Sequence, residues 1–160
     1  MKENFDITCS IVVYKEDLED LYRTIESFLS IKLKKHIYLI DNTPTNFYSY
    51  VFNGNDITYI SNNHNTGFGS GHNLILDKIK NISKYHLILN PDVYFKENII
   101  HNLIDILNED KNVSMIAPKV LFPNGEHQYS CRRYPTVSEM LARRFSFLKP
   151  LFKSPRASIS

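Results

Sequence analysis

The sequence is poor in several residue types, and each shortage argues against a class of protein. It has no tryptophan and only two cysteines, Cys9 and Cys131, which are far apart and lack the spacing of a metal site. This argues against a disulfide framework and favours a reduced chain. No apolar run reaches the ~18–20 residues that span a bilayer, and residues 1–6 lack the apolar region of a signal peptide. We therefore expect a cytoplasmic protein.

The charge of the chain is low overall but unevenly distributed. At 160 residues with 42% hydrophobic content, the chain is long enough for one domain with a real core. Residues 132–160 hold seven lysines and arginines against one acidic residue, and the remainder is net acidic. The acidic body argues against nucleic-acid binding. The basic, aromatic-dotted tail fits either contact with an anionic membrane surface, such as the inner face of the plasma membrane, or a structural element without its partner.

Strand-like and helix-like segments alternate along the chain. The expected strands cover residues 7–13, 37–40, 57–60, 85–89 and 113–117. The expected helices cover residues 18–29, about 71–81 and the apolar face of residues 99–107. This order predicts an α/β protein, a three-layer α/β/α arrangement with a mostly parallel sheet. The pattern fades near residue 130, so we expect a domain over 1–130 and a basic segment over 131–160 whose end is unstructured.

Short polar clusters follow the first four expected strands. They are Tyr14-Lys15-Glu16, Asp41-Asn42, the segment 62–71, and Asn90-Pro91-Asp92. In open α/β sheets, ligands bind in the crevice beyond the carboxyl ends of the strands. Four such ends predict one binding site assembled from distant segments.

The segment 62–73 is the strongest of these motifs. Of the five glycines in the chain, three lie within it at Gly67, Gly69 and Gly71. Glycines let a backbone turn sharply and approach a ligand closely, and the next helix offers free N–H groups to an anion. The alternative is a turn that only packs helix against strand. The segment is neither a Walker loop nor a dinucleotide fingerprint.

Each of the other clusters has a functional and a structural interpretation. Asp92 could bind Mg²⁺ or Mn²⁺ together with phosphate oxygens, or cap the next helix. Asp41 and Asn42 could accept a hydrogen bond from a base or ribose, or Asp41 could hold a turn. Residues 14–16 could contact a base, or simply begin a helix. Of six histidines without metal spacing, only His64 and His72 fall near the predicted site.

Taken together and in order, these motifs resemble the signatures of family 2 glycosyltransferases. The residues that carry the resemblance are Ser10-Ile11-Val12-Val13-Tyr14-Lys15, Ile40-Asp41-Asn42, Asn62-x-x-Asn65-Thr66-Gly67-Phe68-Gly69-x-Gly71-x-Asn73 and Leu89-Asn90-Pro91-Asp92. The closest subgroup is similar to bacterial rhamnosyltransferases of polysaccharide assembly, over roughly residues 6–130. The resemblance implies a GT-A fold, a nucleotide-diphosphate sugar donor, a saccharide or lipid-linked saccharide acceptor, and Mg²⁺ or Mn²⁺.

The resemblance also implies residue roles. Tyr14, Glu16 and Asp41 would contact the nucleoside, and Asp92 would bind the metal. The loop along the donor would comprise Asn65, Gly67, Phe68, Gly69 and Gly71. Asn90 would stand at the first position of the family's Asp-x-Asp motif, which leaves one strong metal ligand.

The sequence departs from the family in its length. Family members continue into a second half that builds the acceptor site and supplies the catalytic base. Here the only late carboxylates are Glu126 and Glu139, and neither lies in a matching motif. We therefore expect a truncated, donor-binding half, without an assigned base. Two hypotheses stay open, an inverting glycosyltransferase and a remnant that at most binds a nucleotide sugar. A nucleotidyltransferase is disfavoured because no glycine-rich, basic loop follows the first strand.

Overall fold

The computed structural model describes residues 5–52 and 54–128. The chain divides into two compact units, Met1–Ile116 and Ala117–Ser160. The basic segment predicted over 131–160 lies outside the described residues, so its interpretation stays a prediction. Among the helices that are described, none is long and apolar enough to cross a membrane.

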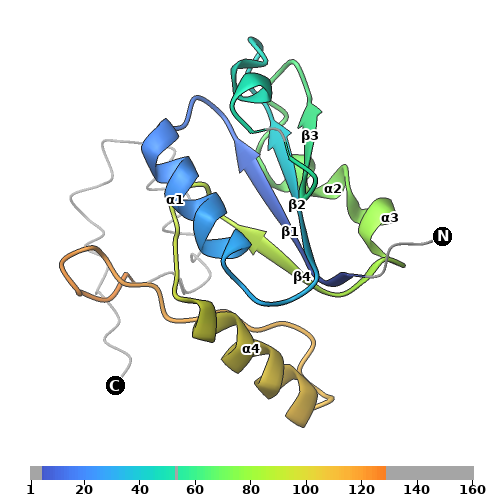
Figure 1. Ribbon diagram of the computed structural model, residues 1–160, viewed down its shortest axis with the longest axis vertical. Coiled ribbons are helices and arrows are strands. Elements are labelled where there is room, and N and C mark those ends of the chain that lie inside the picture. The colour runs from blue at the N-terminus through green and yellow to red at the C-terminus, as the bar shows by residue number, and fades with distance from the viewer. Residues whose placement is uncertain (1–4, 53, 129–160) are drawn as a thin grey trace, which may run out of the picture. The chain divides into compact units, whose positions relative to one another are not determined.

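A four-stranded parallel sheet forms the centre of the first unit (Figure 1). Its strands are β1 (Phe5–Val13), β2 (Lys35–Asp41), β3 (Ile57–Ser61) and β4 (Ser83–Leu89), in the order β3-β2-β1-β4. Cys9 of β1 lies opposite Ile37 of β2 and Leu87 of β4. The first four predicted strands and the parallel sheet are thus confirmed. The apolar run of β1 is continuous because this strand is flanked on both sides and covered on both faces.

Helices cover both faces of this sheet, which confirms the three-layer α/β/α arrangement. Helices α1 (Leu18–Leu29) and α4 (Glu97–Glu109) pack on one face, around Ile11, Phe28 and Ile100. Helices α2 (Phe68–Asn73) and α3 (Leu76–Ile79) pack on the opposite face, where Val12 and Ile40 meet Ile75 and Ile79. Successive side chains of a strand point to opposite faces, so neighbours such as Ile11 and Val12 enter different clusters.

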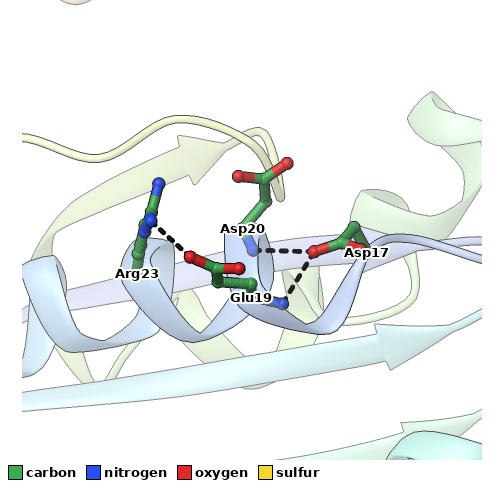
Figure 2. A network of polar contacts seen from close by, with 4 residues as sticks. All are labelled: Asp17, Glu19, Asp20 and Arg23. Carbon is green, nitrogen blue, oxygen red and sulfur yellow. Dashed lines mark hydrogen bonds and ion pairs between the residues drawn. The ribbon is translucent and has the colours of Figure 1, made fainter.

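Helix α1 begins at an aspartate that caps its free backbone N–H groups. Oδ1 of Asp17 accepts from the N–H of Glu19 at 2.8 Å and of Asp20 at 3.3 Å, as Figure 2 shows. Arg23 pairs with Glu19 one turn along on the exposed surface. The buried face of the helix carries Leu21, Ile25 and Phe28 at helical spacing. Cap and apolar face together hold α1 at the carboxyl end of β1.

Replacing Asp17 by alanine should lower the free energy of unfolding by about 1 kcal/mol. The loss arises because two N–H groups of the first turn exchange a side-chain acceptor for water. Urea unfolding monitored by circular dichroism measures it. Asp17→Asn keeps a side-chain oxygen and should restore most of the loss, and equal losses in both variants would contradict a capping role.

The single helix predicted over residues 71–81 is wrong in its bounds and in its continuity. Helix α2 begins earlier, at Phe68, and ends at Asn73, and α3 follows from Leu76. The N–H groups of Leu74 and Ile75 bond to carbonyls three residues back, which tightens the last turn of α2. Glycines and Asn73 are weak helix formers, and the break still leaves Ile75 and Ile79 buried.

The predicted fifth strand over residues 113–117 is also wrong. That segment has no strand conformation, and the Met115 side chain is 88% exposed. A strand needs a neighbour for its backbone N–H and C=O groups, and β4 pairs only with β1 in the described part of the chain. An apolar sequence alone therefore did not make a strand here.

The described part of the second unit contains a tight turn that the sequence predicts. Leu121 and His127 form an antiparallel bridge, and the N–H of Gly125 donates to the Phe122 carbonyl at 2.8 Å. Gly125 has a φ of +84°, a conformation that favours glycine. This confirms the turn predicted at Pro123-Asn124-Gly125.

Candidate functional site

The carboxyl ends of β1, β2, β3 and β4 lie at one edge of the sheet because all four strands are parallel (Figure 1). The four polar segments named above follow these ends. Three spacings between neighbouring strands amount to about 14 Å from β3 to β4. Helix α2 narrows this span, since it crosses back from β3 to pack Gly71 against Val12 of β1. The glycine loop therefore lies over the middle of the edge.

Asp41 at the end of β2 is fully buried and already accepts two hydrogen bonds. Its Oδ1 accepts from the N–H of Thr43 at 2.7 Å, and its Oδ2 accepts from the Tyr59 hydroxyl at 2.5 Å. Burial and this bond to the carboxylate both raise the pKa of Tyr59. The carboxylate thus holds β3 and the turn after β2 in place. Its predicted contact with a nucleoside is tested by no observation and stays a prediction.

Asn42 joins the end of β2 to the glycine loop, and it belongs to the Asp41-Asn42 cluster that the sequence places at the predicted site. Its side chain is 1% exposed. Its Oδ1 accepts from Nδ2 of Asn62 at 3.0 Å and from the Thr66 hydroxyl at 3.3 Å. Its Nδ2 donates to the Gly67 carbonyl at 3.3 Å and lies 3.5 Å from Oδ1 of Asn65. The sequence placed Asn42 near the site but did not predict that it holds the glycine loop.

The backbone turn of the glycine loop is held by the side chain of Asn65 within the loop. Gly67 has a φ of +86°, and its N–H donates to Oδ1 of Asn65 at 2.9 Å. A Cβ at Gly69 would meet open space, so this glycine leaves room beside the backbone. Phe68 is about half exposed, and its ring lies edge-on to His72 at 4.3 Å. Asn65, Gly67, Phe68 and Gly69 are all accessible to a ligand.

Gly71 has a packing function, the structural alternative to a ligand contact. A Cβ at this position would lie 2.7 and 2.9 Å from the two methyl carbons of Val12. Only glycine lets α2 approach β1 this closely. The predicted contact of Gly71 with a nucleotide sugar stays a prediction.

Replacing Gly71 by alanine should therefore destabilise the protein by about 1–3 kcal/mol, as overpacked cores do. The added methyl group forces α2 away from Val12, which shifts the loop. Thermal unfolding by calorimetry measures the loss. Gly71→Ala combined with Val12→Ala should recover part of it, since the colliding methyl groups are gone; no recovery would contradict the steric cause.

The loop after β1 is tied to the connection after β2. The N–H of Lys15 donates to the Thr43 hydroxyl at 3.2 Å, and the Glu16 carbonyl accepts from the Tyr48 hydroxyl at 2.8 Å. Tyr48 belongs to the short helix η1 (Phe47–Tyr50) and is buried. The Tyr14 ring is 40% exposed, with Nζ of Lys15 at 5.4 Å from its centre. This leaves Tyr14 as an accessible ring face at the edge of the sheet.

Asn90 and Asp92 follow β4 and are both exposed. The backbone between them is anchored, because the Pro91 carbonyl accepts from the Thr24 hydroxyl at 2.8 Å. In the described ranges, no three histidine, cysteine, aspartate or glutamate side chains cluster as they would to hold a metal ion. A preformed cage does not fit these residues. An Mg²⁺ or Mn²⁺ ion does fit if it takes one carboxylate from Asp92 and its remaining ligands from phosphate and water.

The two histidines near the site lie in different surroundings. His64 is exposed in the loop after β3, whereas His72 on α2 is buried. Burial lowers the pKa of His72. It also lowers the pKa of His86 on β4 to about 4, with a further contribution from His72.

A parallel three-layer α/β domain with polar loops at its carboxyl edge has the architecture of the GT-A nucleotide-sugar transferases. The model of one sequence family, Glycosyl transferase family 2, matches residues 8–158. The chain therefore belongs to glycosyl transferase family 2. A search of curated proteins found no match. Membership assigns the chain to the glycosyltransferases, which use a nucleotide-sugar donor and a saccharide acceptor.

Proposed function

We propose that this protein transfers a sugar from a nucleotide-diphosphate donor to a saccharide or lipid-linked saccharide acceptor in cell-surface polysaccharide assembly. The transfer is inverting and metal-dependent, similar to that of bacterial rhamnosyltransferases. The convergence of four polar loops on one edge of the sheet is the observation that carries this proposal. Family membership supports the transferase class, and the ordered motifs support the subgroup.

We infer that the nucleoside lies against the loop after β1. Tyr14 offers an exposed ring face there, and Glu16 follows on a backbone anchored by Tyr48. Asp41 is covered, so a direct contact with the nucleoside requires Thr43 or Tyr59 to move aside. The pyrophosphate would then run along the exposed loop residues toward β4.

We assign the metal-binding role to Asp92, with Asn90 beside it. When bound, Mg²⁺ or Mn²⁺ neutralises the charge that builds on the departing diphosphate. The anchored Pro91 carbonyl keeps the segment next to α1 and leaves Asp92 exposed at the sheet edge. The protein supplies one carboxylate ligand in this proposal, so metal binding should depend on the nucleotide for further ligands.

The proposed reaction forms one bond and breaks one at the anomeric carbon. The acceptor hydroxyl attacks this carbon from the side opposite the diphosphate, the bond to the phosphate oxygen breaks, and the configuration inverts. A carboxylate base takes the hydroxyl proton. No residue is assigned to this base.

The direct test is donor binding followed by turnover. Purified protein is titrated by calorimetry with uridine, guanosine and deoxythymidine diphosphate sugars in the presence of Mn²⁺. We expect saturable binding of at least one donor, and release of nucleoside diphosphate once an acceptor is added. Absence of binding to every donor would overturn the proposal.

A binding module without turnover is the second candidate. It is favoured because carboxylates at this edge that could act as the catalytic base are already engaged. Both oxygens of Asp41 and one oxygen of Asp17 accept hydrogen bonds within the protein. The same assay separates the two candidates: donor binding without release of nucleoside diphosphate above a no-enzyme control supports the module. A cytoplasmic location at the inner face of the plasma membrane is a further proposal, supported by the basic residues of 132–160.

A further inference from the structure

A series of hydrogen bonds between side chains runs across the α2 face of the sheet, buried at His72 and partly buried toward β4. Nδ1 of His72 lies 2.7 Å from the Ser10 hydroxyl, which lies 2.8 Å from Nε2 of His86. Nδ1 of His86 lies 2.9 Å from the Thr8 hydroxyl, and that hydroxyl lies 2.8 Å from the hydroxyl of Ser83. This series of hydrogen bonds therefore links α2 to β1, and β1 to β4, through side chains.

The hydrogen bond at the Ser83 end of this series determines which atom donates in each of the others. The Ser83 hydroxyl donates to the Tyr85 carbonyl, which can only accept. Ser83 must then accept from Thr8, and Thr8 must accept from Nδ1 of His86. A neutral His86 carries one ring proton, so its Nε2 accepts from Ser10. Ser10 in turn accepts from Nδ1 of His72, which assigns both histidines the Nδ1–H tautomer.

This assignment leaves Nε2 of His72 with a lone pair and no proton. The atom is buried and has no hydrogen-bond partner in the part of the chain that the structure describes, and His72 as a whole is 5% exposed. Protonation there would place a charge and an unpaired N–H inside the protein, which is costly. The lowered pKa values of His72 and His86 follow from the same burial.

The position of His72 connects this series of hydrogen bonds to the glycine loop. His72 is next to Gly71, which packs against Val12, and the Phe68 ring at the start of α2 lies edge-on to the imidazole. The hydrogen bond to Ser10 thus fixes the polar side of α2 on β1 just beyond that contact. Loss of this bond would release the helix that continues the loop.

We propose that His72 is a positioning residue whose neutral imidazole holds α2 on β1, so that its protonation displaces the glycine loop and weakens donor binding. This inference rests on the proposed nucleotide-sugar function of the loop. The folded protein favours the neutral form of His72. Helix α2 is therefore fully held on β1 above the ordinary histidine pKa of about 6.5, and this hold is lost as the pH falls through the lowered pKa of His72. Each further pH unit below that value should weaken binding about tenfold.

Other ionisable groups share this face and must be separated from His72. They are Asp6 of β1, His36 and Tyr38 of β2, His86 of β4, and the exposed Asp77 and Lys78 of α3. The ammonium group of Lys84 on β4 extends away from this face and donates to Asn108 of α4. Helix α2 itself has no other ionisable side chain. Among these groups, His86 is the one in the series of hydrogen bonds, and with its pKa at about 4 it titrates at a lower pH than an unperturbed histidine.

The test compares the pH dependence of donor binding in three proteins. The ligand is the nucleotide sugar that binds in the donor-binding test described above. Its affinity is measured by calorimetry with Mn²⁺ between about pH 5 and about pH 7.5, where both phosphate groups of the nucleotide sugar stay ionised. In His72→Asn, the amide Nδ2 can still donate to Ser10 but does not titrate. We expect near-normal affinity at the upper pH and a weakening that begins at a lower pH than in the wild type. The matched control, His101→Asn on α4, should keep the wild-type profile.

A second measurement on the wild type is independent of donor binding. Nitrogen chemical shifts of the imidazoles report the tautomers, and hydrogen exchange reports protection of the amides of Gly71 and Leu74. We expect the Nδ1–H form of His72 at neutral pH, and protection that falls with pH in the wild type but at a lower pH in His72→Asn.

The outcomes separate this inference from the proposed function. Identical profiles in the wild type and His72→Asn, or an Nε2–H tautomer of His72, would overturn the inference even if donors bind. If no donor binds, the proposed function fails, and tautomer and exchange data alone decide whether His72 positions α2.

Discussion

Replacing Asp92 by alanine is expected to abolish metal-dependent binding of the nucleotide sugar. Asp92 is an exposed carboxylate at the carboxyl edge, and the described residues around it form no cluster of three metal-ligating side chains that could take over its task. Asp92 is the one charged ligand that we propose for the ion, so its removal is expected to remove the protein's main contribution to metal binding. We expect the affinity measured by calorimetry with Mn²⁺ to fall at least ~100-fold, since loss of a group that merely supports a metal ligand already costs about 10–100-fold in metal affinity.

The same argument predicts how the ion itself binds. Without nucleotide, the protein should bind Mn²⁺ too weakly to measure, because Mn²⁺ and Mg²⁺ need further oxygen ligands that the pyrophosphate supplies. Asp105→Ala, which removes an exposed carboxylate from α4, should leave donor affinity unchanged. Unchanged affinity in Asp92→Ala, with and without Mn²⁺, would remove Asp92 from the site.

Replacing Asn42 by alanine should lower the free energy of unfolding by about 2–3 kcal/mol and also weaken donor binding. The side chain is buried, and its loss leaves Nδ2 of Asn62 and the Gly67 carbonyl with fewer partners. A buried polar group without its partner costs about 1–3 kcal/mol. Two groups lose a partner, but three of the four contacts of Asn42 are 3.3–3.5 Å long, so we expect the summed loss to stay at about 2–3 kcal/mol. Urea unfolding and donor calorimetry measure the two effects.

Two further variants isolate the cause of the Asn42 effect. Asn42→Asp keeps the acceptor for Asn62 and Thr66 but loses the donor to Gly67 and adds a charge beside the Asn65 oxygen. It should be at least as unstable as the alanine variant. Asn102→Ala, on the exposed side of α4, should change stability by less than ~0.5 kcal/mol. Wild-type donor affinity in Asn42→Ala would contradict the role of Asn42 in holding the loop.

The sheet and the long helices could be predicted because their signals are local. Continuous β-rich apolar runs identified the four strands, and the three- and four-residue spacing of Leu21, Ile25 and Phe28 identified the buried side of α1. The carboxyl edge followed from the parallel order alone. Where the signal depended on a neighbour, prediction failed, as for residues 113–117, which lack a pairing strand among the described residues.

The candidate site was predictable in position but not in its internal contacts. Asp41 was put forward as a ligand contact, yet its carboxylate accepts from Thr43 and Tyr59 inside the protein. The contacts of Asn42 and His72 were not predicted, because their partners are distant in the sequence: Asn62 is 20 residues from Asn42, and Ser10 is 62 residues from His72. Nothing local in a sequence reports such pairs.

The amino-acid sequence by itself determined the α/β class, the order of the first four strands with helices α1 and α4, and the edge at which the polar loops gather. These depend on periodicity and chain direction, which are properties of short segments. Only the tertiary structure decided that Gly71 serves close packing, that Asn42 anchors the loop, and that His72, Ser10 and His86 share one directed chain of protons. Those roles exist only once burial removes water, because each polar group must then find its partner within the fold.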